Sequence, residues 1–235
     1  MQTVHGEFYE EDIETLEYQL QWYLRYGNVP SAVRRESKAA KVDYGRQYER
    51  YIGYLFEREG YRVTYRGLRA GLKDGGIDLV ARLPRQIRLV QCKRWQQPVS
   101  ADVLSRLQGA KERFVWEERQ GKSPNSRTGI VAVLITSGVV EPDAKKLANH
   151  LGIVLMERIA YQSYPAIKAK RILPNGGKFL LPFTSGYDRL TMDVRKGDRF
   201  FATVREAVAH GFFYPVFYPK TIAEMNRQRG KLTTI

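Results

Sequence analysis

The stretch that decides the fold is residues 74–95, which read DGGIDLVARLPRQIRLVQCKRW. Two apolar segments, IDLVARL and IRLVQCK, flank the short turn PRQ, and this pattern predicts a β-hairpin. The hairpin nevertheless carries Asp78, Gln91 and Lys93, and an unpaired charge in a protein core costs several kcal/mol. We therefore expect these polar groups either to satisfy one another or to form a functional site.

Side chains alternate along a strand, so Gln91 and Lys93 share one face while Val90 and Cys92 share the other. Asp78 lies on the preceding strand and can converge with them at one end of the sheet. Carboxylate, amide and main-chain carbonyl oxygens, the last from Cys92, are hard ligands that suit Mg²⁺. A lysine beside such a metal can orient or deprotonate a water, and the metal makes that water more acidic. Cleavage of a phosphodiester needs both services.

Hydrophobic spacing predicts the elements that surround this hairpin. We expect helices at residues 8–26, 44–59, 101–119 and about 141–151, and further strands at 61–66, 129–137 and 152–156. The apolar run GIVAVLITS is typical of a strand that is covered on both faces. From residue 44 the order is α-β-β-β-α-β-α-β, which predicts an α/β fold with a mixed central sheet and helices on both sides.

Three motifs in this order resemble the Mrr-like branch of the PD-(D/E)XK nuclease superfamily. They are GRQYE (residues 45–49), GGIDLVA and VQCKRW. The similarity extends over roughly residues 43–157. It implies a restriction-endonuclease-like fold and a metal-dependent DNA phosphodiesterase, with Mg²⁺ as the cofactor and Mn²⁺ as a substitute.

Carried over position by position, the resemblance implies a role for each motif residue. Asp78 would be the central metal ligand and Lys93 the catalytic lysine. Gln91 stands where most of the superfamily has Glu or Asp, a departure that is normal for the Mrr-like branch and removes one negative charge. Cys92, through its main-chain carbonyl, and Glu49 would also bind the metal. The alternative for Glu49 is an ordinary solvated helix residue.

Several residues in and near the motifs have both a functional and a purely structural interpretation. Asp78 and Lys93 would form a simple cross-strand ion pair if no metal binds, and such a pair is worth little at a surface. Asp74 either joins the site or caps the turn. Arg94 and Trp95 follow the motif and are expected to contact DNA, although Trp95 either stacks on a base or closes the hairpin.

Composition restricts the class of protein. The 235 residues carry a formal net charge of +14, which points to an anionic partner and most simply to nucleic acid. The single cysteine, Cys92, excludes an intramolecular disulfide and a zinc site built from cysteines, and it fits a reducing cytoplasm. No apolar run is long enough to span a bilayer, and the N-terminal residues do not resemble a signal peptide, so we expect a cytoplasmic protein without a membrane partner.

The chain divides by texture into three segments: 1–42, a helix and linker; 43–160, the nuclease domain; and 161–235, a small basic C-terminal module. Residues 1–40 hold four basic and seven acidic side chains, whereas residues 161–235 hold thirteen basic and five acidic. The clearest element of the last segment is ATVREAVAHGF, where Thr203 and Glu206 form a capping box and Gly211 ends a helix. This module either contacts DNA or packs on the nuclease core or a second chain.

The sequence therefore predicts a metal-dependent DNA endonuclease of the Mrr-like restriction type. Two alternatives remain: a structure-selective nuclease of the kind that resolves Holliday junctions, and a non-catalytic DNA-binding subunit that keeps the fold. Because cutting two strands usually needs two active sites, we also expect a homodimer.

Overall fold

The structure is a computed structural model that describes residues 10–27, 44–66, 76–120, 128–174 and 176–215. Backbone contacts divide the chain into two compact units. The central unit comprises residues 39–164 and 191–195. The terminal unit comprises residues 1–38, 165–190 and 196–235, so it joins segments that precede and follow the central unit in the sequence.

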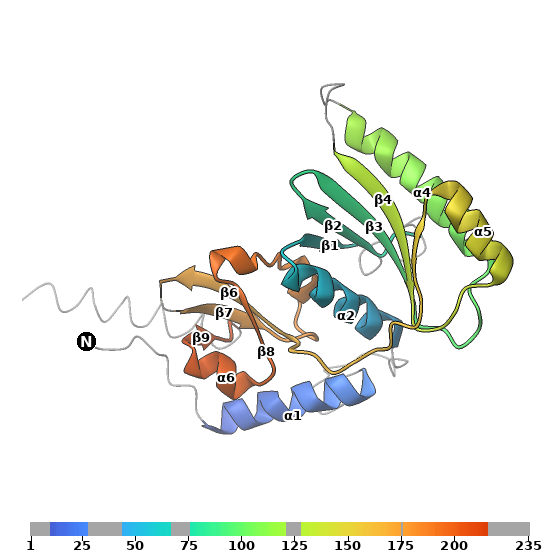
Figure 1. The fold of residues 1–235 in the computed structure, drawn as a ribbon. Helices are drawn as coiled ribbons and strands as arrows, with labels where there is room; N and C mark the ends of the chain where they lie inside the picture. Colours follow the sequence, from blue (N-terminus) through green and yellow to red (C-terminus); the bar gives the residue numbers. More distant parts are fainter. Residues whose placement is uncertain (1–9, 28–43, 67–75, 121–127, 175, 216–235) are drawn as a thin grey trace, which may run out of the picture. The chain divides into compact units, whose positions relative to one another are not determined.

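The central unit is built on a mixed five-stranded sheet in the order β1-β2-β3-β4-β5. Its elements are α2 (Tyr44–Arg58), β1 (Arg62–Tyr65), β2 (Leu79–Leu83), β3 (Gln86–Lys93), α4 (Ala101–Arg119), β4 (Gly129–Thr136), α5 (Pro142–Leu151) and β5 (Val154–Met156). The first three strands are antiparallel, and β3, β4 and β5 are parallel. Figure 1 shows α4 and α5 on one side of this sheet and α2 on the other. The predicted element order and the sheet covered on both sides are confirmed.

The side chains of β3 alternate between these two helical layers, as strand geometry requires. Ile87 and Leu89 belong to the apolar core that includes Leu104 of α4. Arg88 points to the other face, where its guanidinium lies 5.9 Å from the ring of Phe56 in α2. The two faces of β3 therefore meet different helices, and this decides where the polar residues at its end can reach.

The predicted apolar run GIVAVLITS forms β4, which lies between β3 and β5. Residues 132–136 of this strand are all buried. Two neighbouring strands and helices on both faces exclude water from them, which explains why the sequence shows no alternation there. Among the helices that the structure describes, none combines the length and the hydrophobicity that crossing a bilayer requires.

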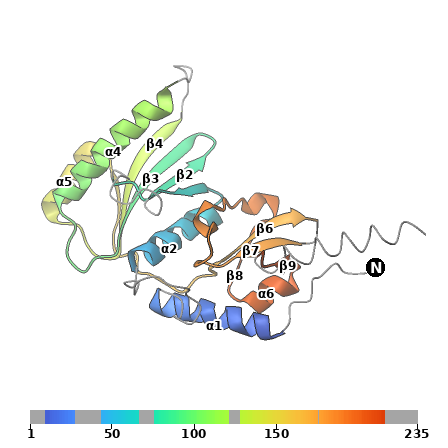
Figure 2. The same ribbon diagram turned by 180° about the vertical axis from the view of Figure 1, so that it is seen from behind.

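The terminal unit is built on a second mixed sheet, in the order β8-β6-β7-β9. Its elements are α1 (Glu10–Tyr26), β6 (Ile167–Leu173), β7 (Gly176–Leu180), the 3-10 helix η3 (Tyr187–Arg189), β8 (Arg199–Phe201), α6 (Val204–Ala209) and β9 (Phe212–Phe213); a further 3-10 helix, η4 (Val194–Lys196), spans the boundary between the units. Figures 1 and 2 both show α1 beside α6 on one side of this sheet. The helix predicted around Thr203 is α6, and the Thr203 side chain accepts a hydrogen bond from the Glu206 N–H at 3.1 Å.

The first helix shares its core with residues from the far end of the sequence. Residues 1–42 are predicted as an N-terminal helix and linker, and in the structure Ile13, Leu16 and Leu20 of α1 pack into one core with Phe179 and Phe201. In an isolated helix this apolar stripe would be exposed to water. Packing against the sheet formed by residues much later in the sequence buries it. The predicted linker falls almost entirely within residues 28–43, outside the described residues.

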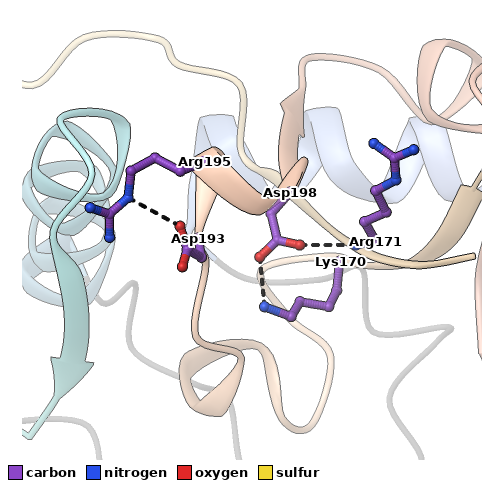
Figure 3. Close-up of polar contacts among 5 residues, drawn as sticks. All are labelled: Lys170, Arg171, Asp193, Arg195 and Asp198. Atoms are coloured by element: carbon purple, nitrogen blue, oxygen red, sulfur yellow. Dashed lines mark hydrogen bonds and ion pairs between the residues drawn. The ribbon is translucent and has the colours of Figure 1, made fainter. Parts of the chain in front are cut away.

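One short piece of the C-terminal segment belongs to the central unit and not to the terminal unit. Residues 191–195 group with the central unit. Within this piece the Arg195 Nε atom lies 3.4 Å from the Asp193 carboxylate (Figure 3). Composition changes along a sequence do not reveal such a crossing, because these five residues differ little from their neighbours in polarity.

Candidate active site

The backbone of Asp78 is held on both sides at the point where β2 begins. Its N–H donates to the carbonyl of Val90 at 2.9 Å, and its own carbonyl accepts the N–H of Arg66 at 2.7 Å. These bonds extend the sheet by one residue beyond the start of β2 at Leu79. The direction of the Asp78 side chain is therefore set by the sheet, which is a more rigid support than a loop.

The carboxylate of Asp78 ties the two strands of the hairpin together. Its Oδ2 atom accepts a hydrogen bond from Gln91 Nε2 at 2.6 Å and another from the Cys92 N–H at 2.7 Å, and all three residues are buried. Because β2 begins only at Leu79, this carboxylate takes the Cys92 N–H that a strand carbonyl would otherwise accept. The buried polar groups of the hairpin thus satisfy one another, as the cost of burying them requires.

The structure explains why one of the two positions before Asp78, residue 76, is a glycine. Its φ of +91° is a conformation that side chains rarely adopt, and an added Cβ would lie 3.1 Å from Gln91 Oε1. A larger residue would therefore strain the turn and push on the amide that holds Asp78. Asp74, the other candidate in this turn, lies outside the described residues.

Electrostatics link the remaining candidates to the same end of the sheet. Burial raises the pKa of the Cys92 thiol well above its usual value, and the negative charges of Asp78 and Glu49 raise that pKa further. Lys93 acts on the same thiol in the opposite direction and lowers its pKa. Glu49 is half-buried, and its Oε2 atom is shielded from solvent. The charges of Glu49, Asp78 and Lys93 therefore all act on the buried end of β3.

Tyr48 fixes the turn of α2 that carries Glu49. Its hydroxyl donates to the carbonyl of Ile159 at 2.7 Å, and the Ile159 N–H donates to the carbonyl of Thr136 at 3.0 Å. Thr136 is the register partner of Lys93. This chain of contacts joins α2 to the end of β4, so Tyr48 positions Glu49. Sequence reasoning missed this role, although Tyr48 lies within the GRQYE motif.

Lys93 and Trp95 contact each other. The Lys93 Nζ atom lies 4.7 Å from the centre of the Trp95 ring, and the Lys93 carbonyl accepts the N–H of Ser137 at 3.0 Å. A cation over an aromatic ring at an exposed site gains about 0.5–1 kcal/mol. The Trp95 ring therefore restricts the flexible Lys93 side chain. Neither sequence interpretation of Trp95 included this contact. Trp95 remains 44% exposed.

Arg94 is held between two tyrosines. Its guanidinium carbon lies 5.0 Å from the centre of the Tyr44 ring and 4.9 Å from that of the Tyr161 ring. A guanidinium stacked by its faces keeps its N–H groups at the edge, where they can meet an anion. The two tyrosines are too far apart in the chain for any local pattern to have indicated this arrangement.

The donor atoms of the site suit a hard divalent cation that keeps several of its waters. Within the residues described, no group of three or more His, Cys, Asp and Glu side chains could hold a metal. A metal here would therefore depend on the carboxylates of Asp78 and Glu49, the amide oxygen of Gln91 and the main-chain carbonyl of Cys92, all of which are hard oxygen ligands. Asp78 contacts Gln91 and Cys92 through their N–H groups, so the fit to such an ion rests on the chemistry of the four oxygen donors.

Comparisons with known proteins bear on the same part of the chain. Residues 41–162 match the family of the Mrr catalytic domain (Mrr_cat), described as restriction endonuclease. One similar crystal structure, of a protein of unknown function called AF1548, is 20% identical with a TM-score of 0.35, covering 48% of this chain and 57% of that protein. Another, the MspJI restriction endonuclease in complex with a 27-mer oligonucleotide, is 15% identical with a TM-score of 0.29, covering 56% of this chain and 34% of that protein.

This chain thus spans a little over half of the first of these proteins and about a third of the second. No curated protein matches this sequence. The family match covers just over half of the 235-residue chain and contains all three motifs noted above. The chain therefore belongs to the restriction endonuclease family defined by the Mrr catalytic domain.

Proposed function

We propose that the central unit is the catalytic domain of a metal-dependent DNA endonuclease of the Mrr-like restriction type, which hydrolyses phosphodiester bonds. The observation that carries this proposal is the buried carboxylate of Asp78, which accepts hydrogen bonds from Gln91 and Cys92 of β3, the strand that ends at Lys93. Both of these donors are neutral, so neither of them cancels the negative charge of Asp78. Membership of the restriction endonuclease family supports the assignment.

The residues divide the work between them. Asp78, Glu49, Gln91 and the Cys92 carbonyl would hold Mg²⁺, with Mn²⁺ as a substitute, and the bound ion would supply a more acidic water and stabilise charge on the phosphate. Lys93, restrained by the Trp95 ring, orients the attacking water and takes part in removing its proton. Gln91 contributes no charge, so the donor set carries one negative charge fewer than a site with Glu there.

Duplex DNA is the proposed substrate and partner. The guanidinium of Arg94 is exposed and preorganised between Tyr44 and Tyr161, so it can bind a backbone phosphate without first losing its freedom. The exposed part of the Trp95 ring can contact a sugar or base. Cutting both strands would require two copies of the site, and we propose a homodimer for that reaction.

One observation favours the alternative of a non-catalytic DNA-binding subunit. The Asp78 carboxylate accepts two buried hydrogen bonds, and a chain without activity would still need them for its fold. The two functions differ in what they require of Asp78. Catalysis needs its charge, whereas the fold needs only an oxygen acceptor at that position.

A cleavage screen with the full chain tests the proposal. Supercoiled plasmid, linear, single-stranded, methylated and branched DNA would each be incubated with Mg²⁺, with Mn²⁺ and with EDTA. We expect nicking or linearisation of plasmid in Mg²⁺ and none in EDTA. Cleavage restricted to branched DNA would instead show a structure-selective nuclease, and DNA binding without cleavage in either metal would show the non-catalytic subunit.

A further inference from the structure

The terminal unit contains a basic groove of about 440 Å³. It is lined by Arg171, Arg199 and His210, by three glycines, and by Pro174, Ala209 and Phe212, with no carboxylate among these described residues. All three of these basic side chains are exposed. Two guanidiniums and an imidazole supply the polar side chains of the groove, and this chemistry suits an anion.

A buried carboxylate organises one wall of this groove. Asp198 accepts the backbone N–H of Arg171 at 3.0 Å and pairs with Lys170 Nζ at 2.6 Å. Figure 3 shows both contacts, with the guanidinium of Arg171 pointing away from Asp198. Lys170 pairs with this carboxylate, and Asp198 fixes the backbone at Arg171, whose side chain lines the groove.

Gly197 provides the surface along which the Arg171 side chain runs. Its φ of +87° favours glycine, and an added Cβ would lie 2.8 Å from both Cδ and Nη1 of Arg171. The Arg171 guanidinium also donates to the carbonyl of Pro174. The position of this cation is therefore built by its neighbours and does not depend on a free side chain settling at random.

Arg199 lies on the same face of the sheet as Arg171. Its register partner on β6 is Ala169, and Arg171 follows two residues later. In the part of the chain that the structure describes, the Arg199 side chain makes no hydrogen bond or ion pair. Arg205 on α6 differs from Arg199, because its side chain pairs with Glu10 of α1. The backbone N–H of Arg205 also donates to the Glu17 carboxylate. The charge of Arg199 is thus left for a partner outside the unit.

We propose that this groove is a second contact for the phosphate backbone of duplex DNA, made by Arg199 and Arg171 with His210 at its rim. The inference rests on the proposed function in taking DNA as the partner. Two exposed guanidiniums on neighbouring strands can each meet a phosphate. The groove adds affinity and takes no part in the cleavage chemistry.

Binding of a fluorescein-labelled duplex by the full chain, followed by anisotropy in EDTA over a series of KCl concentrations, tests the groove. Arg199→Gln should weaken binding roughly five- to tenfold at 0.1 M salt and reduce the log–log salt slope by about 0.9, the value for one lost phosphate contact. Arg199→Lys should restore most of the affinity. The matched control is Arg189→Gln, an equal loss of charge at an exposed residue of the same unit outside the groove, and it should bind like the wild type.

Affinity and salt slope of Arg199→Gln equal to those of the wild type would overturn the proposal, as would an equal loss in Arg189→Gln. If Arg199→Gln folds poorly, phenylglyoxal labelling of the wild type decides instead: DNA should protect Arg199 and not Arg189, and equal labelling contradicts the groove. The nuclease proposal fails separately, through absence of cleavage by the wild type.

Discussion

The two units each contain a buried aspartate that joins two strands, and the comparison shows what each aspartate is for. Asp78 accepts the Gln91 amide and the N–H of the next residue, Cys92. Asp198 accepts the Lys170 ammonium and the N–H of the next residue, Arg171. The pattern is the same, but the side-chain donor is neutral in the central unit and charged in the terminal unit.

The charge of that donor decides how much negative potential is left. An ammonium 2.6 Å from the Asp198 carboxylate cancels most of its charge, so this pair is complete within the protein. A neutral amide does not cancel the charge of Asp78, and in our proposal a bound cation shares the cost of burying that charge. The same motif of hydrogen bonds therefore serves structure in one unit and, in our proposal, a metal in the other.

The largest effect is expected from the lysines of the two units. Lys93→Met should slow cleavage by about 10²- to 10⁴-fold, the usual contribution of a positioned proton-transfer group, while the free energy of unfolding changes little. Lys170→Met should leave cleavage at saturating DNA unchanged and lower stability, because it leaves Asp198 buried without its ion pair. Single-turnover cleavage and thermal melting of both variants measure the contrast. Equal cleavage by Lys93→Met and the wild type would remove Lys93 from the chemistry.

Leu20 tests whether α1 belongs to the terminal unit. It is fully buried in the core of that unit, and Leu20→Ala should cost about 2–5 kcal/mol there. Leu104→Ala is the matched change in the core of the central unit. Hydrogen exchange should show lost protection in β6 and β7 for Leu20→Ala, and in β3 and β4 for Leu104→Ala. Lost protection in β3 for Leu20→Ala, with β6 unchanged, would contradict the division into units.

A smaller effect is expected at Arg94. Arg94→Ala should weaken DNA binding by roughly five- to tenfold at 0.1 M salt, the loss expected for one phosphate contact, without lowering the cleavage rate at saturating DNA. Tyr161→Leu, which removes one stacking ring but keeps the charge, should weaken binding less. Anisotropy titrations of both variants provide the measurement. An effect of Tyr161→Leu as large as that of Arg94→Ala would mean that the ring itself contacts DNA.

The central unit could be predicted from the sequence because its information is local. Asp78, Gln91 and Lys93 lie on adjacent strands joined by a short turn, so alternation alone brings them to one end of the sheet. The contacts that hold the neighbouring charges are long-range: Tyr48 bonds to Ile159, and nothing in the periodicity of either segment specifies its partner. Hydrophobic patterns report which face is buried and not what covers it.

Most of the terminal unit could not be predicted from the sequence, because its contacts are long-range and its strands are short. Its strands β8 and β9 contain three and two residues, too few for a period to show. Its core also depends on α1, which packs against the sheet but lies near the opposite end of the sequence. The helix around Thr203 was predicted because its cap and its stop are local signals.

The most direct test of the central claim compares Asp78→Asn with Asp198→Asn. An asparagine oxygen can still accept the hydrogen bonds from Gln91 and Cys92, so Asp78→Asn should keep the free energy of unfolding within about 1 kcal/mol of the wild type. We predict that Asp78→Asn loses Mg²⁺-dependent nicking of supercoiled plasmid by orders of magnitude yet still binds DNA, and that Asp198→Asn nicks normally at saturating DNA. Wild-type nicking by folded Asp78→Asn would show that its charge serves no metal and would contradict the account.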